Sequence, residues 1–239
     1  MVVERELRGR PGRLTARERE VLRLVERGRT NSEIARRMGI GRPTVARHLS
    51  NAMDKLGAES RTFSIASAPH EPRVTIATRM RDSAFKRALR EATEIEIDAP
   101  QGLMVLHDDA ARPAVFLAGG IGITPFLSMA RDAAYRKLPH RIFLFYANRR
   151  QQDAAFLDEL RHLQNPNYRL IAALSEPAAG WTGESGFIRR ELLERHLPDL
   201  HAPIYYFAGP PAMTMAMQTM LGELGVADAD MRSEEFYGY

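Results

Sequence analysis

Two glycine-containing turns are the segments best suited to chemistry. Gly119-Gly120-Ile121-Gly122-Ile123-Thr124-Pro125 follows an apolar run and precedes a helical pattern, and Gly209-Pro210-Pro211 occupies a second junction of the same kind. Glycines between a strand and a helix let the backbone approach a phosphate, to which the helix N-terminus offers unpaired N–H groups. Because ligands of an open sheet sit at the carboxyl ends of strands, two such junctions can line one crevice. The first turn departs from G-x-G-x-x-G, since Pro125 occupies the sixth place counted from Gly120.

Composition and residue spacing exclude several other kinds of site. The 239 residues include no cysteine, which excludes disulfides, thiol catalysis and cysteine-held zinc or iron–sulfur clusters. The seven histidines show no HExxH or other metal spacing, and no G-x-S-x-G elbow occurs, so we expect no metal site. No apolar run approaches the roughly 20 residues that cross a bilayer, and the N-terminus lacks the apolar core of a signal peptide. We therefore expect a cytoplasmic protein with no membrane partner.

The elements that position the glycine turns follow from periodicity. Strand-like stretches cover 63–67, 74–78, 94–98, 114–118, 142–146, 169–174 and 204–207, and helical patterns cover 83–90, 124–136, 153–163, 187–196 and 211–224. From 114 onward strands and helices alternate. The predicted fold class is therefore α/β, with a C-terminal doubly wound parallel sheet, a partial antiparallel β region before it and an all-α N-terminus.

The N-terminal segment differs in charge and pattern. Residues 1–61 hold 15 Lys and Arg against 8 Asp and Glu, a net charge of +7, whereas the remainder is 19 − 22 = −3. Capping boxes, Thr15 with Glu18 and Thr30 with Glu33, open two short helices, and a third begins near Arg42-Pro43. Two short helices joined by a glycine turn are typical of a helix-turn-helix, whose second helix enters the major groove of DNA. The exposed candidates for DNA contact are Arg42, Thr44, Arg47 and His48.

This segment resembles the LuxR-type helix-turn-helix family. The resemblance rests on Leu14-Thr15 with 17–22, on Asn31–Arg37, on Thr44-Val45 with 48–51, and on Lys55-Leu56-Gly57. It implies transcriptional control through binding of double-stranded DNA, usually as a dimer. Two departures stand out: Gly41-Arg42-Pro43 replaces Ser-Pro-Arg, and the family's fourth helix is replaced by a strand-like stretch from Phe63.

The rest of the chain resembles the ferredoxin–NAD(P) reductase superfamily. Arg61-Thr62-Phe63-Ser64 resembles the flavin signature, the two glycine turns resemble the nicotinamide-side turns, and Glu234–Tyr239 resembles the tail of bacterial members. The resemblance implies FAD and NAD(P)H as cofactors, with hydride transfer from nicotinamide to flavin and no catalytic acid or base required. Arg61 would pair with the FAD pyrophosphate, Phe63 would lie along the flavin, and Ser64 would reach its redox edge. The remaining implied cofactor contacts are Arg81, Asp82 and Ser83 for flavin, and Gly119, Gly120, Gly122, Thr124, Gly209, Pro210 and Pro211 for nicotinamide dinucleotide.

The junction of the two resemblances leaves both segments short. We expect a helix-turn-helix at 1–60, a partial flavin-binding β region at 61–111 and an NAD(P)-binding domain at 112–239. The first strands of the flavin barrel are replaced by the helix-turn-helix, so tight FAD binding is a hypothesis. Three functions stay open: a flavin-dependent NAD(P)H oxidoreductase with a DNA-binding module, a regulator whose body senses nicotinamide or is a scaffold, and a remnant with neither activity. The electron acceptor is unknown, and Asn148-Arg149-Arg150 leaves NAD versus NADP open.

Overall fold

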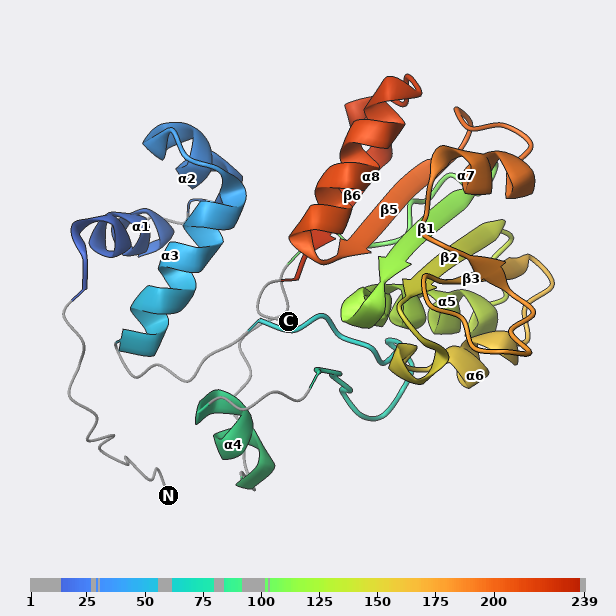
Figure 1. Cartoon of the computed structure of the whole chain (residues 1–239), viewed down its shortest axis with the longest axis horizontal. Coiled ribbons are helices and arrows are strands. Elements are labelled where there is room, and N and C mark those ends of the chain that lie inside the picture. The colour runs from blue at the N-terminus through green and yellow to red at the C-terminus, as the bar shows by residue number, and fades with distance from the viewer. Residues whose placement is uncertain are drawn as a thin grey trace. The chain divides into compact units, whose positions relative to one another are not determined.

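The computed structural model describes residues 14–26, 29, 31–55, 62–79, 84–91, 102 and 104–236 (Figure 1). The chain divides into two compact units. One comprises residues 1–62 and 80–96, and the other comprises residues 63–79 and 97–239. The larger unit carries both glycine turns.

A six-stranded parallel sheet forms the centre of the larger unit. Its strand order is β4-β3-β2-β1-β5-β6. The strands span β1 Ala114–Gly119, β2 Ile142–Asn148, β3 Tyr168–Leu174, β4 Glu184–Ser185, β5 Ile204–Gly209 and β6 Met231–Glu235. Every strand pair is parallel, so all carboxyl ends lie along one edge of the sheet. β1 and β5 are buried along their whole length, as parallel strands covered on both faces should be.

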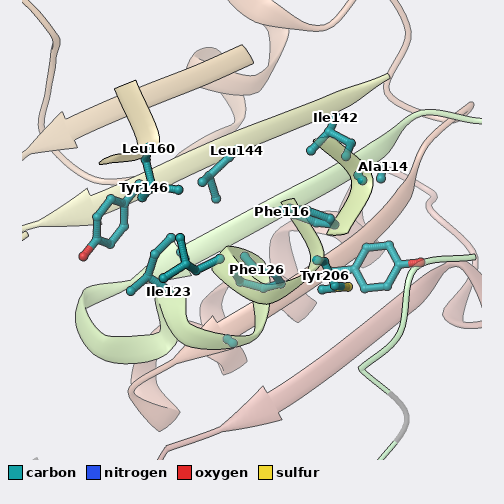
Figure 2. Close-up of a cluster of buried hydrophobic side chains, with 14 of the residues drawn as sticks. Ala114, Phe116, Ile123, Phe126, Ile142, Leu144, Tyr146, Leu160 and Tyr206 are labelled. Carbon is teal, nitrogen blue, oxygen red and sulfur yellow. The ribbon is translucent and has the colours of Figure 1, made fainter. Parts of the chain in front are cut away.

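Helices cover both faces of this sheet. α5 (Thr124–Tyr135) and α6 (Leu157–Arg161) contribute to one hydrophobic cluster, while α7 (Arg190–His196) and α8 (Pro211–Glu223) contribute to the other. Figure 2 shows the first cluster, in which the Phe116 ring of β1 stacks on Phe126 of α5 at 4.9 Å between centroids. The Tyr206 ring meets Phe116 edge-on at 5.3 Å. Since α5 leaves β1 toward one face and α8 leaves β5 toward the other, the chain reverses its winding between β1 and β5.

The segment 63–79 packs on α5 within the same unit. Ala66 is fully buried in the first cluster, and the Ser128 hydroxyl donates to the Ser67 carbonyl at 2.7 Å. Arg131 donates to the Ala66 carbonyl at 3.3 Å and forms ion pairs with Glu71 at 3.1 Å and with Glu159 at 2.6 Å. These contacts fix the described part of the expected flavin region against the sheet domain.

The described part of the smaller unit includes three helices, α1 (Ala16–Glu26), α2 (Asn31–Met38) and α3 (Arg42–Lys55). Val21, Leu24, Ile34, Met38 and Val45 form their shared core, together with Ala35. The predicted first capping box is present: Thr15 N–H donates to the Glu18 carboxylate at 2.7 Å, and Glu18 N–H donates to the Thr15 hydroxyl at 3.2 Å. The second box cannot be followed, because Thr30 lies outside the described residues. A further helix, α4 (Ala84–Glu91), also belongs to this unit.

The parallel α/β prediction is confirmed, with differences in individual elements. The strands expected at 63–67 and 74–78 are reduced to one antiparallel bridge between Ile65 and Ile76. The helix expected at 153–163 begins only at Leu157, since Phe156 adopts a left-handed φ of 60° that interrupts it, and the helix expected from 187 begins at Arg190. The short strand β4 and the edge strand β6 were not predicted. The strand expected at 94–98 lies outside the described residues.

Candidate functional site

The candidate site is the edge of the sheet where the chain leaves β1 and β5. After β1 the chain forms a 3-10 turn, Gly120–Ile123, that leads into α5, and after β5 it turns through Gly209 and Pro210 into α8. β1 and β5 are neighbours in register, with Ala118 opposite Ala208. The two predicted glycine junctions therefore meet at the point where the winding reverses, where an open α/β sheet binds ligands.

Close packing of these two turns explains two of the glycines. A Cβ at Gly122 would lie 2.2 Å from the Ala208 carbonyl oxygen and 2.7 Å from the Gly209 nitrogen. A Cβ at Gly119 would lie 2.2 Å from the Met213 sulfur. Position 122 needs glycine so that the turns can touch, because the obstructing atoms are backbone, whereas at Gly119 the obstructing atom belongs to a flexible side chain. Gly120 needs it for a different reason, because its φ of 55° is left-handed.

Buried hydroxyls stabilise both turns. Thr124 is 1% exposed, and its hydroxyl donates to the Ile121 carbonyl at 3.1 Å. Thr214, at the start of α8, is 2% exposed and donates to the Pro211 carbonyl at 2.9 Å. In this geometry the hydrogen of the Thr124 hydroxyl is used within the turn. A role for Thr124 in cofactor binding remains a prediction.

The expected flavin segment reaches the candidate site through Ser64. Its hydroxyl donates to the Glu234 carboxyl at 2.9 Å, joining residues that are 170 positions apart. Glu234 lies on β6 opposite Ala208, and the Phe236 N–H donates to the Gly209 carbonyl at 3.0 Å. Burial raises the pKa of Glu234, and the hydrogen bond from Ser64 opposes that shift. A hydroxyl and a carboxyl of this kind can hold a proton beside the candidate site.

Arg79 of the expected flavin segment lies near the first glycine turn. A Cβ built on Gly120 would lie 3.9 Å from an Nη atom of Arg79. The guanidinium group thus borders the site where a phosphate would meet the turn, and Arg forks suit phosphate oxygens. Sequence reasoning missed both Arg79 and Glu234 as site residues. The tail motif that includes Glu234 was the available signal, whereas nothing in the sequence singled out Arg79.

Several predicted flavin contacts cannot be placed. Arg61, Arg81, Asp82 and Ser83 lie outside the described residues. Phe63 is half-buried in the larger unit. The residues present fit a nicotinamide dinucleotide at the two glycine turns. For FAD, the described residues that could make contact are Phe63 and Ser64, the latter paired with Glu234.

The smaller unit presents the predicted DNA-contacting residues on α3. Arg42 and Arg47 are exposed, and Thr44 and His48 are half-exposed, while Val45 between them is fully buried. The turn before α3 uses Gly39 at a left-handed φ of 63°, and the Gly41 carbonyl accepts hydrogen bonds from Thr44 N–H and Val45 N–H. The helix start predicted at Arg42-Pro43 is confirmed. α3 therefore has a polar, partly basic exposed side and an apolar buried side.

Comparison with known protein families assigns both parts of the chain. Residues 116–219 match the oxidoreductase NAD-binding domain, and residues 13–68 match the bacterial regulatory proteins of the luxR family. The chain thus joins a LuxR-family helix-turn-helix segment to an oxidoreductase NAD-binding domain. This confirms both resemblances that the sequence motifs indicated.

Curated relatives with known names also match the chain. A component of the Na(+)-translocating NADH-quinone reductase of Yersinia enterocolitica is 32% identical over 208 residues, covering 83% of this chain and 50% of the relative. The corresponding component of the Methylococcus capsulatus enzyme is 32% identical over 164 residues, covering 65% of this chain and 40% of the relative. The chain therefore spans half or less of the length of these relatives.

Solved structures support the same fold. The ferredoxin reductase of carbazole 1,9a-dioxygenase aligns with a TM-score of 0.61 at 23% identity, covering 73% of this chain and 55% of that chain. A ferredoxin NADP+ reductase from Neisseria gonorrhoeae with bound FAD and NADP aligns with a TM-score of 0.60 at 21% identity, covering 73% of this chain and 79% of that chain. The larger unit therefore has a ferredoxin reductase-like fold.

Two features are absent from the described part of the chain. Among these residues, every helix falls short of the length and apolar character that a membrane span requires. Within the same ranges, no three His, Asp or Glu side chains are grouped so that they could share a metal ion.

Proposed function

We propose that the protein is an NAD(P)H-dependent flavin oxidoreductase with an appended DNA-binding segment. The observation that carries this proposal is the hydrogen bond between Ser64 and Glu234. It brings the residue expected at the flavin redox edge to the strand beside Gly209, within the same unit as the first glycine turn. This proximity supports a site in which the residues expected at the flavin and those expected at the nicotinamide dinucleotide act together.

The residues of the chain would bind the dinucleotide, orient the flavin and hold a proton near it. Backbone N–H groups at the start of α5 would bind the dinucleotide phosphates, with Arg79 as the adjacent cation. Phe63 and Ser64 would orient FAD, and Glu234, paired with the Ser64 hydroxyl, would hold a proton near it. A bound flavin supplies the two-electron acceptor for hydride from the nicotinamide. The final electron acceptor is not assigned.

Steady-state kinetics of the full chain test this function. FAD-dependent oxidation of NADH or NADPH, with ferricyanide as artificial acceptor, is expected for the wild type. Ser64→Ala should lower kcat about 100-fold, at the lower end of the range attributed to groups that assist proton transfer. Ser233→Ala, at an exposed neighbouring position on β6, is the matched control and should leave kcat unchanged. No FAD-dependent oxidation by the wild type, or equal effects of the two variants, would refute the assignment.

The exposed residues of α3 support a second function, binding of double-stranded DNA. Arg42 and Arg47 would contact phosphates or guanine edges from the major groove, and Thr44 could contact bases or phosphates. The family resemblance favours a dimer on DNA. Retardation of duplex DNA should weaken as salt rises, because phosphate contacts release counterions.

A pair of charge-matched variants tests this second function. Arg47→Ala should weaken DNA binding more than Arg23→Ala, which removes an equal charge from α1. Binding that is insensitive to salt, or equal effects of the two substitutions, would argue against the proposed orientation of α3.

A further inference from the structure

One side of α5 carries four side chains that contact the expected flavin segment. They recur at intervals of three and four residues, the spacing that lines a single face of an α-helix. The four are Ser128, Arg131, Asp132 and Tyr135. The Ser128 hydroxyl donates to the Ser67 carbonyl at 2.7 Å, and an Nη group of Arg131 donates to the Ala66 carbonyl at 3.3 Å. The start of the stretch 66–71 is therefore bound to this helix face.

The end of the same stretch packs on the next turn of this face. The His70 ring stacks on the Tyr135 ring, with 3.8 Å between centroids and 9° between planes. Nδ1 of His70 also lies 3.9 Å from the Asp132 carboxylate. Glu71 follows directly and forms an ion pair with Arg131 at 3.1 Å. The stretch thus follows α5 over about two turns of the helix.

Arg131 is the centre of this contact. Its Nε donates to the Glu159 carboxylate of α6 at 2.6 Å, while one Nη group donates to both Glu71 and the Ala66 carbonyl. The planar guanidinium fixes these directions, which a flexible ammonium group does not. Arg131 is 21% exposed, so solvent screens its ion pairs only in part. Without this cation, Glu71 and Glu159 would be neighbouring like charges, and their repulsion would displace the stretch from α5.

The position of this stretch decides where Ser64 lies. Ser64 is two residues before Ala66, and its hydroxyl donates to Glu234 of β6. The chain at this point is therefore fixed to β6 at one end and to α5 at the other. α5 itself begins at the turn Gly120–Ile123, where we expect the dinucleotide phosphates. One helix thus supports both the residues expected at the flavin and those expected at the dinucleotide.

We propose that Arg131 is a positioning residue for hydride transfer. It acts through residues 66–71, which set the position of Ser64 and of the flavin relative to the first glycine turn. The proposal rests on the proposed function, because it assumes that flavin binds at Phe63 and Ser64 and that the dinucleotide binds at the turn. Displacement of reacting groups by about 1 Å can lower a rate by about 100-fold. Loss of Arg131 should therefore slow flavin reduction without weakening dinucleotide binding.

Stopped-flow reduction of the FAD-reconstituted full chain tests this role. The reductant is NADH or NADPH, whichever reduces the wild-type flavin faster. Arg131→Met keeps a long side chain but removes the charge, and it should lower the saturating rate of flavin reduction about tenfold. The dinucleotide concentration at half-saturation should stay unchanged, because the glycine turns are untouched. Arg131→Lys restores the charge and should recover part of the lost rate.

Substitution of each partner of Arg131 isolates the contact with the stretch. Glu71→Gln removes the partner on the stretch and should also slow flavin reduction, so the role can be tested even if Arg131→Met does not fold. Glu159→Gln removes the partner on α6 and is the matched control, since both carboxylates bind the same guanidinium. It should leave the rate of flavin reduction unchanged.

Hydrogen exchange of the protein without FAD gives a second readout. The Ala66 N–H donates to the Thr75 carbonyl at 2.8 Å, and the Ala68 N–H donates to the Glu71 carboxylate at 2.8 Å. Both amides should exchange about fivefold faster in Arg131→Met, because the stretch opens more often once its ion pair is lost. In Glu159→Gln both should exchange at the wild-type rate.

The outcomes separate this inference from the proposed function. Flavin reduction at the wild-type rate in Arg131→Met and Glu71→Gln, or equal slowing in Glu159→Gln, would overturn the positioning role alone. A raised half-saturation concentration with an unchanged saturating rate would overturn it too, because Arg131 would then act in dinucleotide binding. A wild type that takes up no FAD would refute the proposed function and this inference with it.

Discussion

Replacement of Gly122 by alanine should damage both the stability and the dinucleotide site of the larger unit. The added Cβ would lie 2.2 Å from the Ala208 carbonyl oxygen, 2.5 Å from its carbon and 2.7 Å from the Gly209 nitrogen. Real Cβ contacts essentially never fall below 3.0 Å, so the two turns must separate by at least 0.8 Å. The obstructing atoms are backbone atoms of a central strand, which cannot rotate away.

Overpacking of this kind costs roughly 1–3 kcal/mol, which lowers Tm by about 2–4 °C per kcal/mol in a chain of this size. The displaced turns should also weaken NADH binding, since they are the phosphate-binding elements of the proposed site. Thermal unfolding and calorimetric titration of the full chain measure the two effects.

Gly222→Ala is the matched control for this prediction. Gly222 lies in α8, and a Cβ there would meet nothing within 4 Å. Alanine in place of a helical glycine stabilises by roughly 0.5–1 kcal/mol, so this variant should unfold at or above the wild-type temperature and bind NADH normally. A Gly122→Ala protein with wild-type Tm and wild-type NADH affinity would show that the turns do not pack as described.

Three further predictions concern single contacts. Thr15→Ala removes half of the capping box with Glu18, costs about 1 kcal/mol, and should speed hydrogen exchange of the α1 amides about fivefold. Burial raises the pKa of Glu234 above its ordinary 4.5, so the folded protein loses stability as pH rises past that value. Glu234→Gln should remove this dependence of the free energy of unfolding on pH, measured by urea unfolding from pH 4.5 upward. Burial lowers the pKa of His107 below its ordinary 6.5, so stability should fall as pH drops below 6.5, and His107→Asn should flatten that loss in acid titrations of Tm.

The hydrogen bonds of His107 fix its neutral tautomer. Its Nε2 lies 3.1 Å from the Arg112 carbonyl, which can only accept, so Nε2 carries the hydrogen. Its Nδ1 then accepts from the Tyr206 hydroxyl at 2.9 Å, and that hydroxyl also receives the His107 backbone N–H. Protonation of Nδ1 would place a second donor against the hydroxyl.

The elements of the sheet domain could be predicted where a fully buried strand gives an unbroken apolar run in the sequence. β1 and β5 are apolar throughout, and α5 and α8 begin at prolines directly after glycine turns, so their limits were predicted to within one or two residues. β6 could not be predicted because its sequence, Met231–Glu235, is polar, and its pairing depends on the outer edge of β5. The left-handed Phe156 that shortens α6 also has no signal in the sequence, since an aromatic residue rarely adopts that conformation.

The glycine turns of the candidate site could be predicted from the sequence, but the contacts around them could not. Glycines at 119, 120 and 122 were expected to admit a phosphate, whereas Gly122 admits the backbone of the neighbouring turn. The pairing of Ser64 with Glu234 depends on β6 lying beside β5, which no local pattern indicates. The ion pairs of Glu176 with Arg149 and Arg150 could not be predicted either, because they depend on the pairing of β2 with β3.

Anaerobic titration of the FAD-reconstituted full chain with NADH tests the central claim most directly. If flavin and nicotinamide share the site at the ends of β1 and β5, one equivalent of NADH should bleach the absorbance of the bound flavin, and Ser64→Ala should slow the bleaching. A protein that takes up no FAD, or a bound flavin that stays oxidised in excess NADH, would contradict the account.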